Sequence, residues 1–360
     1  MNQVEEIGDP KKAKSKKYRT IFIIALCASI FIVGGALAAN YFINKKSPAS
    51  AIKKTTTAKK ETLTLCLLDG KSYKSDLATR HPLAISIENH PDARPQYGLS
   101  SASIVYEAIT EGGITRFLAI YGPENTSKIG PIRSARLFFM DWVKEYDAFF
   151  AHAGGNEDAL ANIDPYSIKD IPHSNTYYWR DNAKGVASEH TLFSSTDKLY
   201  QYAQSKKYDI STSNFDALKF KADGPASPEE KSYKINFSSA TYKVSWKYDP
   251  AKNIYIRSLA GKEDVDKENG KAITVNNVII QTVSRTLQPH GSYGSENWVF
   301  KTTGTGSTVI LRDGKAIKGT WKKDNLNSRT KFYDEAGMEI QFNPGHTWYE
   351  IVPPEVNVTI

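Results

Sequence analysis

Residues 103–121 read SIVYEAITEGGITRFLAIY, two largely apolar runs joined by a pair of glycines. Alternating side chains in each run are typical of β-strands, and the glycine pair predicts a two-residue hairpin turn between them. That turn places Arg116 diagonally across from Glu107 and Glu111, on a face that also carries five aliphatic residues. Burying three ionisable side chains there costs several kcal/mol per ion unless they are paired. The hairpin therefore predicts either a structural ion pair that fixes its register or a functional site.

Two arginines follow the hairpin where a helix is expected to begin. In GPIRSARLFFMDWVKEY (130–146), Arg133 and Arg136 are three residues apart and can face the same way in the first turn. Cations at a helix N-terminus oppose the helix dipole, so they need an anion nearby. Glu107, Glu111 or a bound ligand would supply that anion.

A third candidate segment is AFFAHAGGNEDALANI (148–163), where a strand, a glycine turn and a helix are expected. This order places free backbone N–H groups at Gly154 and Gly155 beside His152, a common anion-binding arrangement. Most turns of this kind simply connect two elements, so the segment gains weight only together with the arginines.

The rest of the chain divides by composition into two parts. Strands and helices alternate before the polar stretch KADGPASPEEKS (221–232), and short β-rich runs with turn signals follow it. We expect strands at 83–88, 103–109, 114–121 and 148–153, and helices at 134–146, 156–163 and 194–204. The predicted fold class is α+β: a mixed α/β domain at 62–225, followed by a β-rich domain at 226–360 that forms a sandwich or barrel.

The composition is that of an ordinary globular protein, with 40% hydrophobic and 24% charged residues in a chain of 360. The net charge of +8 comes from one end of the chain. Residues 1–61 hold 12 Lys and Arg against 4 Asp and Glu, and the other 299 residues hold 35 of each kind. The folded part is therefore expected to be neutral, which argues against a nucleic-acid partner.

A membrane anchor is predicted near the start of the chain. Over 21–39 the sequence runs for 19 residues with Ser29 as its only polar side chain, roughly 28 Å of helix, which matches the core of a bilayer. The positive-inside rule then gives a cytoplasmic basic tail at 1–19, a transmembrane helix at 20–43 and an external flexible tether at 44–61. The two folded domains are expected outside the cytoplasm.

Two other interpretations compete with a retained anchor. Ala36, Leu37 and Ala38 match a signal-peptidase site, but the apolar run is longer than the usual secretory core of about 7 to 15 residues. A lipoprotein needs a small residue before its cysteine, whereas Leu26 precedes Cys27. We therefore expect an anchoring helix without lipid, and leave open whether it is cleaved.

Familiar catalytic and metal-binding motifs are absent from the sequence. The seven histidines include no HExxH motif and no pair at metal-binding helical spacing, so neither a metal nor a cofactor is expected. There is no P-loop, nucleophile elbow or dinucleotide-binding glycine motif. Ser195 and Lys198 fit an S-x-x-K pattern, but without its companion motifs this segment is better explained as a capped helix start.

Several motifs of this chain resemble the YerB family, proteins of bacterial envelopes whose two parts are called DUF3048, a domain of unknown function. The resemblance covers Asn89, ARPQYGLSSA (93–102), EGGITRF, GPIRSAR and HAGG in the first part, and YIR (255–257), NNVII, TGTGS, RDGKAIKGTW and NPGHTW in the second. His190 is similar to the histidine of the family's Pro-His-Asn-Leu-Tyr segment, although Glu189 and Thr191 depart from it. Many members are lipoproteins, and this chain is expected to replace the lipid with a helix. The resemblance favours a shared site over an accidental ion pair.

Together these observations predict a membrane-anchored, extracytoplasmic envelope protein that binds an anionic ligand: peptidoglycan, another wall polymer or a partner protein. Arginine suits this role because its planar fork pairs bidentately with carboxylates and phosphates. The candidate ligand-binding residues are Arg94, Arg116, Arg133, Arg136, His152, Gly154, Gly155 and His190. The alternative is an enzyme that cleaves the peptidoglycan glycan, with Glu107 or Glu111 as general acid, although the nearby Arg116 would lower a carboxyl pKa. Whether the protein is an enzyme stays open at this point.

Overall fold

The computed structural model describes residues 62–212, 214–222, 224, 226–288 and 296–360. The predicted cytoplasmic tail (1–19), transmembrane helix (20–43) and tether (44–61) lie outside the described residues. Within the described part, no helix is both long enough and apolar enough to cross a membrane.

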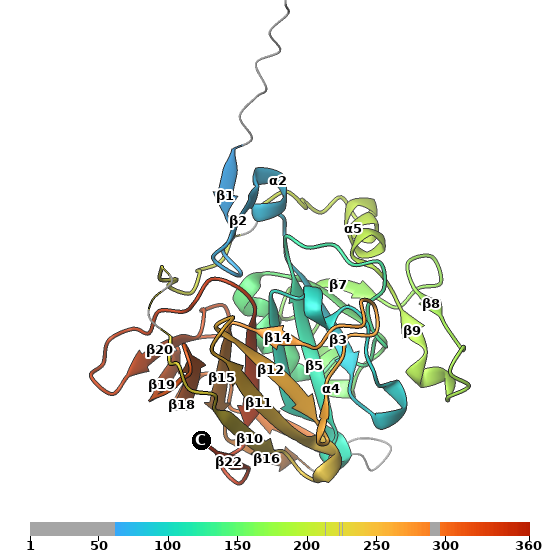
Figure 1. Ribbon diagram of the computed structural model, residues 1–360. Coiled ribbons are helices and arrows are strands. Elements are labelled where there is room, and N and C mark those ends of the chain that lie inside the picture. The colour runs from blue at the N-terminus through green and yellow to red at the C-terminus, as the bar shows by residue number, and fades with distance from the viewer. Residues whose placement is uncertain (1–61, 213, 223, 225, 289–295) are drawn as a thin grey trace, which may run out of the picture. The chain divides into compact units, whose positions relative to one another are not determined.

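A ten-stranded mixed sheet forms the centre of the fold (Figure 1). In spatial order its strands are β20 (Lys331–Asp334), β19 (Lys315–Lys323), β18 (Gly304–Arg312), β15 (Asn277–Thr282), β21 (Thr347–Val352), β4 (Ile104–Ile109), β5 (Thr115–Tyr121), β3 (Leu83–Glu88), β6 (Phe149–His152) and β7 (Lys169–Pro172). The parallel pair of β21 and β4 joins the two predicted domains, with Glu350 beside Glu107. The predicted boundary at residue 225 thus divides the sequence, while the sheet continues across it.

The central strands are buried on both faces, which explains their continuous apolar runs. Every residue of β3, β4 and β5 is buried. A strand that is covered on both faces needs apolar side chains on both of them, so its sequence does not alternate between apolar and polar residues. The charged residues of these strands, Glu88, Glu107 and Arg116, must therefore find partners in the layers that cover the sheet.

A smaller sheet covers one face of the main sheet. It contains β13 (Lys262–Glu263), β12 (Ile254–Leu259), β11 (Lys243–Asp249), β10 (Ser232–Asn236) and β22 (Asn357–Thr359) in that order, with β14 (Thr274–Val275) paired to β12. Along β10, β11 and β12 buried and more exposed residues alternate, so one face of this sheet packs inward. Its Trp246 and Tyr255 join Phe117 and Trp348 of the main sheet in one apolar core. The second part of the chain thus contributes strands to both sheets, and does not close into a separate sandwich or barrel as predicted.

Helices cover the opposite face of the main sheet. Phe138 and Trp142 of α3 (Leu137–Val143) pack with Tyr106 and Leu118 of the hairpin. Ala78 of α2 (Ser75–Ala78) and Ala159 of α4 (Glu157–Ala161) join the same core, whereas the buried apolar residues of α5 (Thr196–Ser205) belong to the core that contains the smaller sheet. The 3-10 turns are η1 (Pro91–Ala93), η2 (Leu99–Ser101), η3 (Glu111–Gly113), η4 (Lys144–Tyr146), η5 (Ser188–His190) and η6 (Ala240–Tyr242). Three two-stranded sheets pair β1 (Leu63–Leu65) with β2 (Ser72–Lys74), β8 (Trp179–Arg180) with β9 (Leu192–Phe193), and β16 (Arg285–Gln288) with β17 (Asn297–Phe300). The fold is mixed and sheet-rich with few helices, which agrees with the predicted class at this coarse level.

The predicted register of the central hairpin is wrong by one residue. The strands are joined by five residues, closed by a hydrogen bond from Thr110 N to Ile114 O at 2.7 Å, and not by the two glycines alone. Arg116 consequently pairs with Ala108, and Glu107 pairs with Phe117. Because side chains alternate along a strand, this shift moves Arg116 to the opposite face of the sheet from Glu107. The constellation expected on one face is divided between two.

The helix after the hairpin also begins later than predicted. It starts at Leu137, and Arg136 precedes it with an extended backbone at φ −134° and ψ 141°. Arg133 donates its backbone N–H to Ser86 O at 2.9 Å, so this segment runs beside the second half of β3, beyond its pairing with β6, before the helix begins. The two arginines therefore do not lie in the first helical turn, and the predicted conflict with the helix dipole is wrong for Arg133.

Candidate functional site

Five charged side chains meet on the helix-covered face of the sheet, and we call them the Arg116 cluster: Glu88, Glu111, Arg116, Arg133 and Arg136. Arg116 Nη2 donates to Glu111 Oε1 at 3.1 Å, and Arg136 Nε donates to Glu111 Oε2 at 3.0 Å. Arg136 Nη2 also bonds to Glu111 Oε1. Arg133 Nε donates to Glu88 Oε1 at 3.0 Å. Four residues predicted from the sequence for the site are thus brought together, although by a different register.

Glu88 connects this cluster to His190, another predicted site residue. Glu88 ends β3 and lies directly opposite Arg116 in the sheet. Its Oε2 is 2.9 Å from His190 Nδ1, while Arg133 occupies its Oε1. Glu88 is not among the residues predicted from the sequence, although a carboxylate at the end of the apolar run LAISIE (83–88) indicates a charge that needs a partner.

Charge and burial differ among the members of the Arg116 cluster. Burial opposes ionisation of Glu111, but the guanidinium groups of Arg116 and Arg136 outweigh it and lower the pKa of Glu111 to about 2. Burial, reinforced by the like charge of Arg136, lowers the pKa of Arg116 to about 9. The side chain of Arg116 is 6% exposed and that of Arg133 is 26% exposed. Arg133 is therefore accessible to a ligand in solvent, whereas Arg116 is buried and fixes Glu111 by its hydrogen bond.

His152 and the glycine turn lie next to the arginine segment. His152 Nδ1 faces Gly154 O at 2.7 Å, and its Nε2 faces Asp170 Oδ1 at 2.8 Å, so both ring nitrogens have partners. Gly154 O also accepts from Ala135 N at 2.8 Å. The carbonyl of Gly154 therefore contacts both the His152 ring and the backbone of Ala135. These contacts hold the segment that carries Arg133 and Arg136.

Arg94 lies apart from the Arg116 cluster and links the main sheet to the smaller sheet. Its Nε and Nη2 donate to the side-chain and backbone oxygens of Asn89, both at 2.9 Å. Its Nη1 donates to Thr241 O at 2.9 Å, and the guanidinium stacks 4.9 Å from the ring centre of Tyr242. These contacts indicate that Arg94 has a structural role, in which it connects the segment after β3 with the segment before β11.

Glu107 belongs to a second group, the Arg257 cluster, enclosed between the two sheets and made up of Glu107, Arg257, Asp264 and Glu350. Arg257 Nη2 donates to Glu107 Oε2 at 2.5 Å, and Arg257 Nη1 bonds to Asp264. Neither Glu107 nor Arg257 has any exposed side-chain surface. Trp246 Nε1 donates to Glu350 Oε1 at 2.7 Å, while burial and the neighbouring Glu107 carboxylate raise the pKa of Glu350 well above its ordinary value.

Sequence reasoning missed Arg257 as a site residue, although it stands in the motif YIR (255–257). In β12 the inward positions are Tyr255, Arg257 and Leu259, so an arginine occupies an apolar parity. That mismatch was the available signal. The identity of its partner could not be read from it, because Glu107 is 150 residues away in the chain.

The geometry gives no support to the enzymatic alternative built on Glu107 and Glu111. The two carboxylates lie on opposite faces of the sheet, so they do not flank a common substrate. Glu111 is held ionised by two guanidinium groups, and a general acid must instead carry a proton. Glu107 is closed off from solvent.

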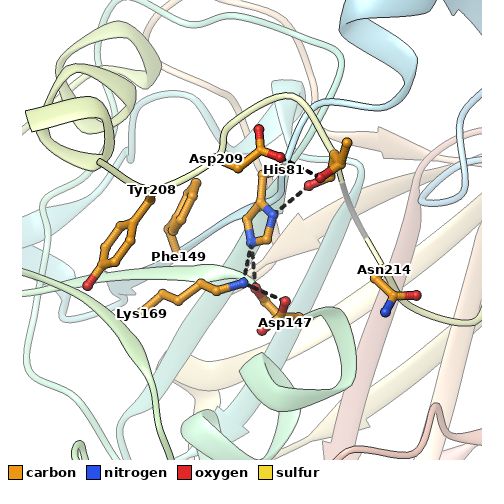
Figure 2. A pocket seen from close by; sticks show the side chains of 8 residues that line it. His81, Asp147, Phe149, Lys169, Tyr208, Asp209 and Asn214 are labelled. Carbon is orange, nitrogen blue, oxygen red and sulfur yellow. Dashed lines mark hydrogen bonds and ion pairs between the residues drawn. The ribbon is translucent and has the colours of Figure 1, made fainter. Parts of the chain in front are cut away.

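A pocket of about 230 Å³ lies elsewhere, around the side chains of His81, Asp147 and Lys169 (Figure 2). His81 Nε2 faces Asp147 O at 2.6 Å, and Lys169 forms an ion pair with Asp147 at 2.5 Å. None of the site residues predicted from the sequence lines this pocket. The polar groups of this pocket are largely paired, since His81 contacts the backbone oxygens of Thr212 and Asp147 and Lys169 contacts the Asp147 carboxylate.

Two family models match this chain. Residues 68–209 match the N-terminal domain, and residues 233–349 the C-terminal domain, of "Protein of unknown function (DUF3048)". A curated relative, "Putative lipoprotein YerB" of Bacillus subtilis (strain 168), is 30% identical over 291 residues, which are 79% of this chain and 85% of that protein. The crystal structure of the YerB protein from Bacillus subtilis aligns with a TM-score of 0.73 and 27% identity, covering 82% of this chain and all of that one.

Proposed function

The chain belongs to the YerB family of DUF3048 proteins, and from that premise we propose that it is a membrane-tethered envelope protein that binds an anionic ligand through the Arg116 cluster. The observation that carries this proposal is the convergence of Arg116, Arg133 and Arg136 around two carboxylates at one end of the central hairpin. The three guanidinium groups pair with Glu88, Glu111 and the more exposed Glu189. If a ligand displaces Glu189, three guanidinium groups and two carboxylates remain, which leaves the cluster with one positive charge for the ligand. A carboxylate or phosphate of an envelope polymer would complete it.

The contact between Arg133 and Glu189 supports a ligand position at this point. Arg133 Nη2 is 3.2 Å from Glu189 Oε1, and the Glu189 side chain is 55% exposed. An exposed ion pair of this kind contributes little to stability, so a ligand carboxylate or phosphate can replace Glu189 at small cost. Glu88 and Glu111 hold the other guanidinium atoms in place, which orders the site before the ligand arrives.

Tethering at the membrane rests on the apolar run at 20–43 and the polar stretch at 44–61. The relative described as a lipoprotein supports an envelope location for this chain. The proposed ligand is peptidoglycan or an anionic polymer attached to it, since these carry the carboxylates and phosphates that arginine recognises. Capture of a protein partner in place of the polymer is an outcome that the test distinguishes.

The test is co-sedimentation of the full-length, detergent-purified protein with insoluble peptidoglycan, prepared with and without its anionic polymers. We expect Arg133→Ala and Arg136→Ala to weaken binding at least about tenfold, since each removes a charge-assisted contact. The control is Arg312→Ala, because Arg312 is also partly exposed and paired with an acid but lies on β18. Equal binding by all three variants would contradict the proposal, as would capture of an envelope protein with no binding to the polymer.

The same incubation also tests the enzymatic alternative. Mass spectrometry of the soluble fraction should find no glycan fragments above those of a protein-free control. Fragments that disappear with Glu111→Gln would reinstate cleavage as the function. Binding without fragments, lost in the arginine variants, would support a non-catalytic role.

A further inference from the structure

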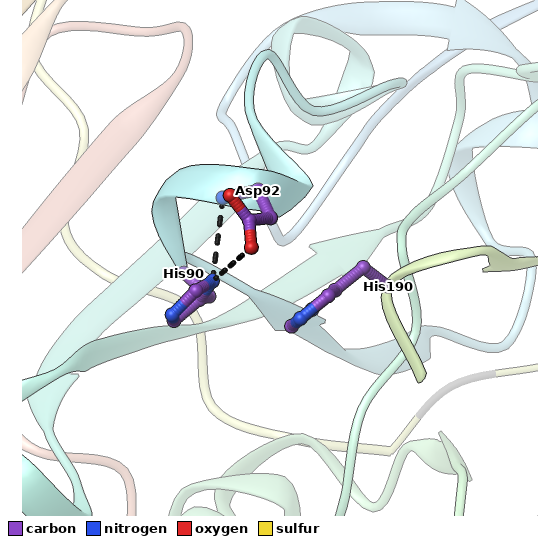
Figure 3. A group of neighbouring side chains, drawn as sticks. All are labelled: His90, Asp92 and His190. Atoms are coloured by element: carbon purple, nitrogen blue, oxygen red, sulfur yellow. Dashed lines mark hydrogen bonds and ion pairs between the residues drawn. The ribbon is translucent and has the colours of Figure 1, made fainter. Parts of the chain in front are cut away.

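Two histidines and an aspartate lie together beyond the end of β3 (Figure 3). They adjoin the proposed anion site, because Glu88 of the Arg116 cluster contacts His190. His90 and Asp92 come from the start of η1, and His190 comes from the end of η5, 100 residues later in the chain. One potential ligand atom from each of the three residues lies within 4.8 Å of the other two. In the part of the chain that the structure describes, this is the one group of three or more such side chains.

His190 is oriented as a metal ligand usually is. Its Nδ1 is 2.9 Å from Glu88 Oε2, and an ionised carboxylate can only accept at this contact. The proton of a neutral imidazole therefore sits on Nδ1, which leaves the lone pair of Nε2 free. Histidines that bind metals almost always donate their other nitrogen to a carboxylate or carbonyl in this way. Glu88 is itself fixed by Arg133, so the ring has a rigid support.

The other two side chains can move to complete a site. Asp92 Oδ2 is 3.7 Å from His90 Nδ1, and these side chains are 58% and 34% exposed, respectively. Zinc binds imidazole nitrogen and carboxylate oxygen at about 2.0–2.2 Å, which places ligand atoms roughly 3.3 Å apart in a tetrahedron. The three atoms therefore need to approach one another by about 1–1.5 Å, a movement that surface rotamers of His90 and Asp92 can supply.

The rings of His90 and His190 are stacked, with centroids 4.8 Å apart and an interplanar angle of 10°. Imidazole lone pairs lie in the ring plane, so two parallel rings do not both aim at one ion. His90 must turn out of the stack when an ion binds. The same change would break the weak contact from Asp92 N to His90 Nδ1, which is 3.3 Å long.

We propose that His90, Asp92 and His190 form a site for a divalent transition metal, with Zn²⁺ as the best match, and with a fourth position open to water or an anion. Two nitrogen ligands and one oxygen ligand are the donor set of mononuclear sites in which the fourth position is exchangeable. This proposal goes beyond the anion-binding function and does not depend on it. It differs from the sequence-based expectation of no metal, which rested on the lack of an HExxH motif and of histidine pairs at helical spacing.

The test uses the full-length, detergent-purified protein after treatment with a chelator and its removal. Co²⁺ is added first, because its visible absorption reports coordination geometry, and Zn²⁺ is then used to displace it. We expect one Co²⁺ per chain with an intense tetrahedral spectrum, and displacement by an equimolar amount of Zn²⁺. His90→Ala and His190→Ala should each weaken binding by at least about 100-fold, since removal of a supporting group alone typically costs 10–100-fold.

His173→Ala is the matched control. His173 is an exposed histidine whose ring packs against Tyr178, and it is not part of the proposed metal site. This variant should bind Co²⁺ like the native protein. His90 is partly exposed, so His90→Ala should keep the native circular dichroism and thus remain informative if His190→Ala fails to fold. Absence of a Co²⁺ spectrum in the native protein would overturn the proposal. Unchanged binding by His90→Ala would overturn it equally.

Failure of the metal site and failure of the anion site are distinguishable. If the metal proposal alone is wrong, peptidoglycan binding still falls with Arg136→Ala, because Arg136 contacts neither His90 nor Asp92. If the anion proposal alone is wrong, the Co²⁺ spectrum is still lost with His90→Ala.

Discussion

The Arg116 cluster and the Arg257 cluster sit on opposite faces of the same two strands and use the same residue types. In the Arg116 cluster the Glu111 carboxylate bridges Arg116 and Arg136, and in the Arg257 cluster Arg257 bridges Glu107 and Asp264. They differ in access: Arg257 and Glu107 have no exposed side-chain surface, whereas Arg133 and Glu111 are 26% and 31% exposed. Residue type alone therefore does not identify a functional site; the covering layer decides whether an ion pair can exchange partners.

The closed cluster joins the layers of the fold. Arg257 brings β12 of the smaller sheet to Glu107 of the main sheet, and its guanidinium lies 4.7 Å from the ring centre of Trp348. A third buried group of charges joins elements on the helix-covered face of the main sheet. There Glu145 accepts from Lys323 at 2.9 Å and from Arg329 at 2.6 Å. Buried charges of this kind fix which elements meet, since an unpaired partner would be costly.

The largest expected effect is at Arg257. Replacement Arg257→Met fills similar volume but leaves Glu107 and Asp264 without their cation, so we expect the free energy of unfolding to fall by about 3–5 kcal/mol. Urea unfolding followed by tryptophan fluorescence measures this at neutral pH. Lys322→Met, which removes an exposed pair with Asp324 at the end of β19, should leave the stability almost unchanged. A similar loss in both variants would remove the distinction between closed and open pairs.

An intermediate effect is expected at Glu111, and it depends on pH. The folded-state pKa of about 2 lies below the ordinary value of 4.5, so the ionised group stabilises the fold above about pH 5 and this contribution is lost as pH falls from 4.5 through 2. After allowance for partial exposure, Glu111→Gln should cost about 1–2 kcal/mol at pH 7. The difference between native and variant proteins should shrink when urea unfolding is repeated at pH 3. A difference that is constant between pH 7 and pH 3 would contradict this assignment.

A smaller change in stability, with a large change in binding, is expected at Arg133. Its partner Glu88 keeps the contact with His190, so Arg133→Ala should lower the free energy of unfolding by about 1 kcal/mol or less. Peptidoglycan binding should nevertheless fall about tenfold, because the exposed guanidinium is lost. Calorimetric melting and co-sedimentation on the same preparation separate the two effects. Loss of binding together with a loss of several kcal/mol would class Arg133 with the closed cluster.

How far the sequence predicts this molecule depends on the distance over which residues interact. The strand at 83–88 agrees with β3, since a continuous apolar run is a local signal. The hairpin was found but its register was wrong, because a five-residue loop and a two-residue turn both fit the glycine pair. That single residue decided whether Glu107 and Arg116 share a face.

Contacts between remote segments could not be predicted in this way. His90 and His190 are neighbours because the fold brings the turns η1 and η5 together. Residue spacing within one helix or strand cannot predict this contact. The same holds for Arg257 and Glu107, which belong to different sheets. A charged residue at an inward-facing position of a strand indicates that it needs a partner. Which residue is that partner follows only from the fold.

The smallest expected effect, at Glu350, tests the closed cluster from its other side. Burial and the adjacent Glu107 raise the pKa of Glu350 well above its ordinary value, so the folded protein favours the protonated carboxyl. Glu350→Gln keeps the acceptor for Trp246 and replaces one neutral group by another, so stability at pH 6 should change by less than about 0.5 kcal/mol. The sign of the pH effect is opposite to that of Glu111: a raised carboxyl pKa favours the folded state at low pH, and this advantage is lost as pH rises above the ordinary value. In urea unfolding the glutamine variant should therefore gain stability relative to the native protein as pH rises above the ordinary carboxyl pKa of 4.5. A loss of several kcal/mol in the variant would instead mean that Glu350 is ionised and shares Arg257 with Glu107.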